Sequence, residues 1–188
     1  IRGTVRLSKD ALERDNIFHF LINHVEPLHV LVVGASSASG STSLYIRRAL
    51  SIGERPRFEV IEQSAESIEY EDLRKSSIVV LNDVRVMNTL AVQLQKYVED
   101  GGGLLVVLGP RATWPAGVAD ILPVTLGVPV DQIGDPVVRI GSIQYGHTIF
   151  EPFQLPRSGD FSTARVYGYR SSVALSSSQV LAEFDTGL

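Results

Sequence analysis

The chain has 188 residues and a formal net charge of −4, with a sequence pI near 5.6, so its composition provides no basic field for a nucleic-acid backbone. Its hydrophobic fraction of 44% and charged fraction of 20% are ordinary for a globular protein and exclude a disordered or fibrous chain. No apolar run approaches the roughly 20 residues of a membrane-spanning helix, and the absence of cysteine excludes disulfides, cysteine-ligated zinc and a thiol nucleophile.

The first 25 residues differ in pattern from the rest. Residues 4–7 and 17–22 are strand-like, and the turn-rich residues between them predict a hairpin. We interpret residues 1–25 as the end of a preceding β module and residues 26–188 as one α/β domain. Because the chain begins at Ile1 rather than Met and ends in a strand-like segment, we expect it to be a piece of a longer protein, cut at both ends.

A strand and a helix are predicted next. Residues 28–33 form a continuous apolar run that ends at Gly34, which is typical of a strand buried on both faces of a parallel sheet. A loop of small residues over 35–40 leads into a helix predicted over 41–52. Its Ser/Thr start offers N-cap residues, and Gly53 offers a stop.

Three further segments continue the alternation. Strands are predicted over 57–61, 78–81 and 104–108, with a short polar helix or turn through 71–73 after the first of them. The alternation of strands and helices favours right-handed crossovers and a doubly wound, mostly parallel, flavodoxin-like sheet. The helix before the last strand ends at Gly101, and its apolar face has helical spacing: Met87, Leu90, Ala91, Leu94, Tyr97 and Val98.

The regular alternation fades after Trp114. Residues 121–126 read as a short helix entering a strand. Residues 137–143, 163–169 and 173–184 read as strands between turns rich in Pro, Gly and Ser. We therefore expect a β-rich C-terminal extension on one side of the sheet.

The stretch from Asp83 to Tyr-Val-Glu-Asp-Gly-Gly-Gly-Leu-Leu-Val-Val-Leu-Gly at 97–109 resembles class I glutamine-amidotransferase-like domains. More narrowly, several segments in order resemble the amidotransferase-like domain of bacterial membrane-anchored, aerotolerance-associated (BatA-like) proteins, which also carry von Willebrand A and immunoglobulin-like modules. The resemblance implies that residues 1–25 finish an immunoglobulin-like module and that the domain is extracytoplasmic (periplasmic). The segments that carry it are residues 12–16, 28–33, 44–50, 80–84, 101–105 and 147–153.

The resemblance also locates a turn that has lost its catalytic residue. In amidotransferases the strand similar to 104–108 leads into a turn that holds the catalytic cysteine, with a histidine and an acid later in the chain. Here the turn reads Gly109-Pro110-Arg111, and proline removes a backbone donor that an oxyanion hole would use. His147 is the one remnant of a catalytic histidine that the resemblance leaves, and it has no thiol to activate. We therefore expect no glutamine hydrolysis.

The loop that carries Ser37, Ser39, Gly40 and Thr42 is the first candidate ligand site. Its spacing resembles the phosphate loop of flavodoxins, where hydroxyls and backbone N–H groups at a helix start hold an anion. It lacks the Gly-Lys-Ser/Thr of a nucleotide-binding P-loop, and the same residues serve equally as a turn and an N-cap.

Four other residues are weaker candidates. Asn82 and Asp83 end a central strand and face the crevice, where a carboxylate can ligate a metal or act as a base, although Asn-Asp is also ordinary turn chemistry. Arg111 suits an anionic ligand or an ion pair with Asp83 or Glu99. His147 suits a structural hydrogen bond, and the four histidines lack the spacing of a zinc site.

The favoured function is a non-catalytic module for ligand or protein recognition within a larger membrane-anchored protein. Its partners would be other modules of that protein or a separate protein, without nucleic acid, cofactor or metal, and this piece would not itself cross the membrane. One alternative is a phosphate- or flavin-binding, flavodoxin-like domain that uses residues 37–42. Another is a non-thiol hydrolase that uses Asp83 and His147.

Overall fold

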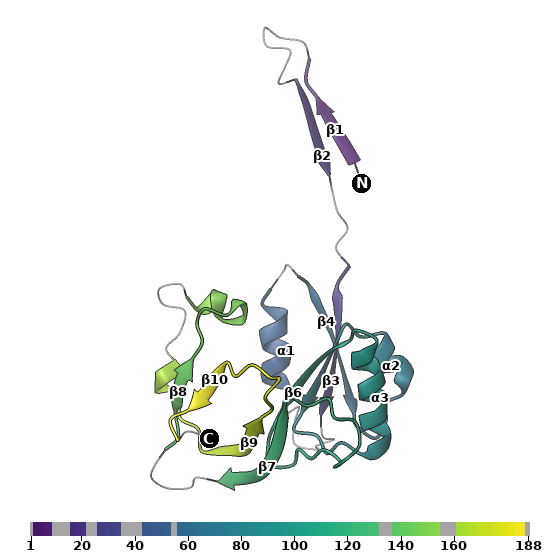
Figure 1. The fold of residues 1–188 in the computed structure, drawn as a ribbon. Helices are drawn as coiled ribbons and strands as arrows, with labels where there is room; N and C mark the ends of the chain where they lie inside the picture. Colours follow the sequence, from purple (N-terminus) through teal and green to yellow (C-terminus); the bar gives the residue numbers. More distant parts are fainter. Residues whose placement is uncertain are drawn as a thin grey trace.

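A four-stranded parallel sheet forms the centre of the chain (Figure 1). The computed structural model describes residues 2–8, 16–21, 26–34, 43–53, 56–131, 137–154 and 161–186. The sheet has the order β4-β3-β5-β6, which with several small antiparallel sheets makes an α/β protein consistent with a flavodoxin-like fold. The predicted parallel sheet is confirmed, and its strands are β3 (Leu28–Gly34), β4 (Phe58–Ser64), β5 (Ile78–Asn82) and β6 (Gly103–Val107).

Helices cover both faces of this sheet, because successive side chains of a strand point to opposite sides. On one face α2 (Tyr70–Arg74) and α3 (Asn88–Glu99) pack over Leu31 and Val79. On the other face α1 (Leu44–Ser51) contributes Ile46 and Leu50, which pack against Val30, Val32 and Val80. The continuous apolar run of β3 is therefore explained by burial on two sides.

The helix starts and faces were predicted with small errors. α1 begins at Leu44 and its N-cap residue is Ser43, so a serine stands at the cap position as predicted, although its side chain makes no capping bond. In α3 the buried residues Leu90, Ala91, Leu94 and Tyr97 confirm the predicted face. Met87 is 67% exposed, because it precedes the helix as its N-cap and has extended rather than helical backbone.

The end of α3 is shaped by Tyr97. Gly101 has a φ of 95°, a left-handed conformation that ends the helix as predicted. The Tyr97 ring lies against Gly102 so closely that a Cβ at that position would overlap it. The Tyr97 hydroxyl lies 3.1 Å from the Ser76 carbonyl and 3.3 Å from the Gly103 carbonyl and donates to this pair. Gly102 thus makes room for a tyrosine that joins α3 to the start of β6.

The C-terminal region is β-rich, as predicted, but its elements have different limits. β7 (Val124–Asp131) pairs with β9 (Gly168–Ala174), and β8 (Ile140–Ile143) pairs with β10 (Ala182–Phe184), both antiparallel. At 121–126 the expected strand is present as the start of β7, but the short helix expected before it is wrong. The single strand predicted at 173–184 is also wrong, because β9 ends at Ala174 and a turn precedes β10. Residues 161–163 form a short 3-10 helix, η2, where a strand was expected to begin, and a second one, η1 (Thr148–Phe153), follows His147.

The predicted N-terminal hairpin is present, as β1 (Arg2–Arg6) and β2 (Ile17–Leu21). Figure 1 shows it apart from the central sheet, at the top of the view. Val5 and Phe18 lie opposite each other and are 50% and 66% exposed. Its assignment to an immunoglobulin-like module stays a prediction. Among the described helices none has the length and hydrophobicity of a membrane span.

Tyr97 should make stability fall in alkaline solution. Burial raises the pKa of its hydroxyl above the ordinary value of 10.0. The unfolded chain therefore releases this proton at lower pH than the folded chain, so the free energy of unfolding decreases as the pH rises above about 10. Tyr97→Phe should cost about 0.5–1.5 kcal/mol at neutral pH, because a buried hydrogen bond is lost. It should also flatten the decline between about pH 9 and pH 11, measured by urea unfolding.

The matched control is Tyr167→Phe, since Tyr167 is 54% exposed. This variant should keep the alkaline slope of the unaltered protein. Equal slopes for Tyr97→Phe and the unaltered protein would contradict the assignment.

Candidate functional site

Asp83 lies at the carboxyl end of β5, where the sheet opens towards the segment that follows β6. Its φ is 53°, a left-handed conformation that aspartate tolerates better than most residues. Its backbone N–H donates to the Val107 carbonyl at 3.0 Å, which continues the pairing of β5 with β6 by one residue. The side chain is 17% exposed and turns towards residues 109–112, the turn singled out in the sequence.

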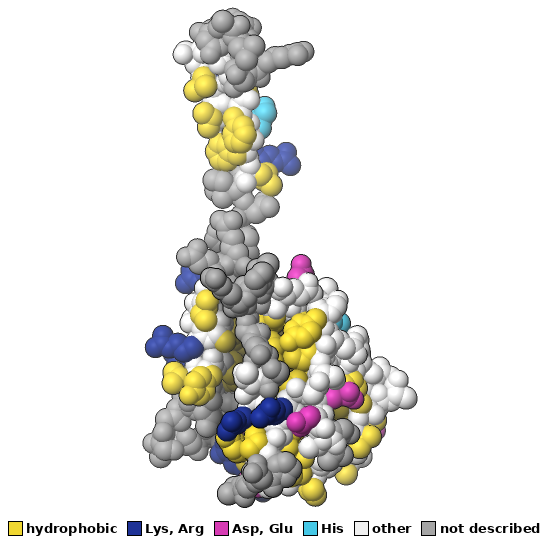
Figure 2. Space-filling model, turned by 90° about the vertical axis from the view of Figure 1, so that its left-hand side faces the viewer, with side chains coloured by type: hydrophobic (Ala, Val, Ile, Leu, Met, Phe, Trp, Pro, Cys, Tyr) yellow, Lys and Arg dark blue, Asp and Glu magenta, His cyan; other side chains and the backbone are white. Residues whose placement is uncertain are grey.

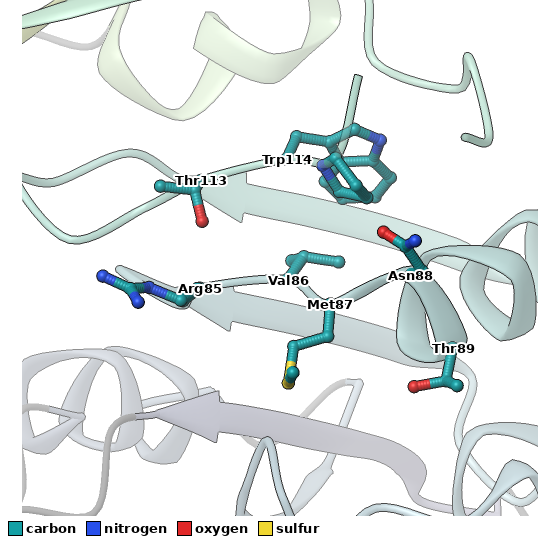
Figure 3. Close-up of a pocket in the computed structure, with 8 residues that line it drawn as sticks. Arg85, Val86, Met87, Asn88, Thr89, Thr113 and Trp114 are labelled. Atoms are coloured by element: carbon teal, nitrogen blue, oxygen red, sulfur yellow. The ribbon is translucent and has the colours of Figure 1, made fainter. Parts of the chain in front are cut away.

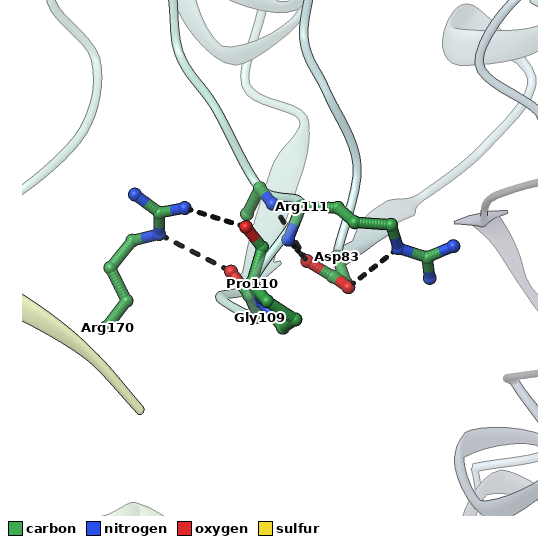
Figure 4. A network of polar contacts seen from close by, with 6 residues as sticks. Asp83, Gly109, Pro110, Arg111 and Arg170 are labelled. Atoms are coloured by element: carbon green, nitrogen blue, oxygen red, sulfur yellow. Dashed lines mark hydrogen bonds and ion pairs between the residues drawn. The ribbon is translucent and has the colours of Figure 1, made fainter. Parts of the chain in front are cut away.

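The turn donates hydrogen bonds to both oxygens of the Asp83 carboxylate. Its Oδ1 accepts hydrogen bonds from the backbone N–H groups of Arg111 and Ala112, both at 2.8 Å. Its Oδ2 accepts from Arg111 Nε at 3.0 Å, which forms an ion pair (Figure 4). Two consecutive N–H groups that converge on one oxygen make an anion-binding nest, and here the anion belongs to the chain itself.

Gly109 is required by the same arrangement. A Cβ at this position would lie 2.5 Å from the Asp83 Cγ, so any side chain would push the carboxylate off the turn. Gly109 and Arg111 of this turn therefore both contact Asp83. They present no nucleophilic side chain.

Arg170 of β9 approaches the turn from the other side (Figure 4). Its Nε donates to the Gly109 carbonyl at 3.4 Å and its Nη2 to the Pro110 carbonyl at 3.2 Å. Its Nη1 donates to the Gly127 carbonyl of β7 at 2.8 Å. One guanidinium thus joins the β7–β9 ribbon to the edge of the central sheet. The sequence analysis missed Arg170, and no local motif marks it.

The other predicted site residues are not brought into one group. Asn82 pairs in register with Gly34 and Val107, at the carboxyl end of the sheet. His147 is the N-cap of η1, where its Nδ1 accepts from the Ile149 N–H at 3.2 Å. Within the described residues, the contacts of His147 and Asp83 have no residue in common. The geometry therefore gives the proposed acid–base pair no support. Ser37, Ser39, Gly40 and Thr42 lie outside the described residues.

A hollow of about 430 Å³ lies beside the turn, between the segment after β5 and the segment after β6. Figure 3 shows Trp114 across from Asn88, with Met87 pointing away from Trp114. The Trp114 Nε1 donates to the Ala119 carbonyl at 3.0 Å, so the indole is held in place. The residues that line the hollow are Arg85, Val86, Met87, Asn88, Thr89, Thr113, Trp114 and Pro115. None of these eight is Asp, Glu or His, so the lining provides no carboxylate or imidazole for acid–base chemistry.

The sequence analysis did not single out Arg85, Thr89 and Thr113 as lining residues. Arg85 and Thr113 come together through a parallel bridge between two segments that have no strand pattern. Among the described residues no group of three or more His, Asp or Glu side chains is arranged to hold a metal ion.

Comparison of the chain with protein-family models, curated proteins and solved structures gives no match. What the structure itself defines is an α/β protein with a parallel sheet of flavodoxin-like order. At the carboxyl end of this sheet, the Asp83 carboxylate accepts hydrogen bonds from the backbone of the turn after β6.

A graded series of variants tests the role of Asp83. Asp83→Ala should cost about 2–4 kcal/mol, because it leaves two backbone N–H groups without their acceptor and places alanine in a left-handed conformation. Asp83→Asn should cost less, because asparagine tolerates this conformation and keeps one acceptor oxygen. Arg111→Ala should cost about 1 kcal/mol or less, since it removes a half-exposed ion pair but keeps the backbone donors.

Chemical denaturation measures the series, with exposed Asp120→Asn as the control for removing a surface carboxylate. If Arg111→Ala proved as costly as Asp83→Ala, the ion pair rather than the backbone nest would hold the turn.

Proposed function

We propose that this chain is a non-catalytic recognition module, built on an amidotransferase-like version of the flavodoxin-like sheet. The observation that carries the proposal is the occupied turn after β6. A turn that activates a nucleophile must present a reactive side chain and leave backbone N–H groups free for the oxyanion of the substrate. In this chain the N–H groups of Arg111 and Ala112 both donate to Asp83.

Pro110 supports the same conclusion, because proline has no N–H and its carbonyl accepts from Arg170. The N–H groups of Arg111 and Ala112 and the carbonyls of Gly109 and Pro110 are therefore all engaged within the chain. The resemblance noted in the sequence therefore favours an amidotransferase-like scaffold whose former nucleophile turn has become a structural joint.

Recognition is supported by apolar side chains left at the surface. Leu105 and Val107 of β6 lie in register with Val80 and Asn82, on the sheet face that α1 covers further along. They are 54% and 39% exposed. Figure 2 shows one side of the molecule, on which hydrophobic side chains lie at the surface of both the hairpin and the α/β body. Exposed apolar patches on folded proteins commonly mark interaction sites.

The partner that fits the proposal is another module of the same protein or a separate protein. The resemblance to BatA-like proteins favours a larger, membrane-anchored bacterial protein with this module on the extracytoplasmic side. Nucleic acid is disfavoured by the net charge of −4.

The catalytic part of the proposal is tested with glutamine as substrate. The purified chain should release ammonia from glutamine no faster than buffer does. Arg111→Cys, which restores a thiol to the turn, should remain inactive because Asp83 still occupies the backbone donors. Glutamine turnover that Asp83→Asn abolishes without unfolding the protein would overturn the proposal.

The recognition part is tested by site-specific photo-crosslinking in the full-length protein in its native membrane. A photoreactive residue at Leu105 should give one discrete crosslinked product, since the proposal places a partner on this face. The matched control is Val92, which is 56% exposed on α3 and lies on the opposite side of the sheet. Equal labelling at the two positions, or none at Leu105, would contradict a partner on this face.

A further inference from the structure

A second cavity lies between the two C-terminal ribbons, away from the occupied turn. It has a volume of about 570 Å³, within the range of about 300–1,000 Å³ that is common for small-molecule sites. The cavity is lined by the start of β7, by Ile140 of β8, by residues of β9 and by the segment from Ser178 to Phe184. Val124, Ile140 and Phe184 form part of an apolar wall, and Arg170 is the one cationic lining residue.

The charge of Arg170 has no acidic partner in the described part of the chain. Arg170 is half-buried as a residue, and its guanidinium donates to three backbone carbonyls, those of Gly109, Gly127 and Pro110. Carbonyl dipoles satisfy hydrogen bonds but leave the positive charge without a counter-ion, so an anion at this cavity would gain a charge-assisted partner. A guanidinium has five N–H groups, so about two remain for another acceptor.

Glu183 also lines the cavity, but it is engaged elsewhere. Its Oε2 accepts from the Ser142 hydroxyl at 3.3 Å, and no ion pair joins it to Arg170 among the described residues. One carboxylate and one guanidinium at the same cavity disfavour a doubly charged anion. They are compatible with a ligand that carries a single negative charge at the Arg170 end.

We propose that this cavity binds a small aliphatic carboxylate. The carboxylate accepts hydrogen bonds from the remaining N–H groups of Arg170, and the hydrocarbon chain lies against Val124, Ile140 and Phe184. Because Arg170 also holds the 109–110 carbonyls, binding strengthens the joint between the β7–β9 ribbon and the central sheet. This site is separate from the β6 surface and does not depend on the proposed recognition function.

The test uses octanoate as the probe and isothermal calorimetry on the full 188-residue chain. Octanol has a similar chain without the charge, and acetate has the charge without the chain. Octanoate should bind at least about tenfold more tightly than either, because charge-assisted hydrogen bonds and apolar burial both contribute. It should also raise the melting temperature.

Two variants locate the site. Ser172→Phe fills the cavity from the face of β9 that carries Arg170, and should weaken octanoate binding at least about tenfold without removing the Arg170 contacts. Leu175→Phe adds the same ring next to β9 at a residue that does not line the cavity, and should leave binding unchanged.

Three results would overturn the proposal. Octanol binding as tightly as octanoate would mean that Arg170 recognises no anion, and unchanged binding in Ser172→Phe would place the ligand elsewhere. Tighter binding of acetyl-Val-Leu with a free carboxylate than of octanoate would assign the cavity to a peptide C-terminus instead. Each of these results leaves the glutamine and crosslinking experiments unaffected, so the two proposals fail separately.

Discussion

The structure depends most on one carboxylate, that of Asp83, at the end of a buried strand. It gathers two backbone N–H groups and one guanidinium of the 109–112 turn around itself. The conformation that results turns the Gly109 and Pro110 carbonyls towards Arg170, which in turn holds Gly127. A single half-buried acid therefore positions the turn after β6, and through that turn the ribbon that leaves the central sheet.

This arrangement is the ground for our proposal of a recognition module rather than an enzyme. The N–H groups of Arg111 and Ala112 are paired with the Asp83 carboxylate, which is an internal anion. Surfaces open to other molecules lie further out, on the exposed residues of β6 and in the cavity between the ribbons. The rigidity of the two-faced core allows these peripheral surfaces to keep their shape.

The central elements could be predicted because their burial leaves a local pattern. β3 lies between two sheet neighbours and under helices on both faces, so nearly every position is apolar. The C-terminal strands are half-exposed and short, and β7 pairs with β9 across a register shift. Their limits are set by the partner strand, which explains why the strands predicted over residues 163–169 and 173–184 were wrong.

Asp83 and Arg111 were found as candidate site residues because they follow strand ends. Arg170 was missed because its carbonyl partners lie far away in the chain.

The order of residues alone was enough to establish an α/β sheet with a glycine-terminated helix before β6, and a turn without a nucleophile. These features follow from hydrophobic periodicity, from the special backbone freedom of glycine and from the identity of single residues. Only the folded chain decided what Asp83 does and where His147 lies. Whether a carboxylate is a base, a ligand or a structural acceptor depends on the donors that surround it, and these come from segments that meet only after folding.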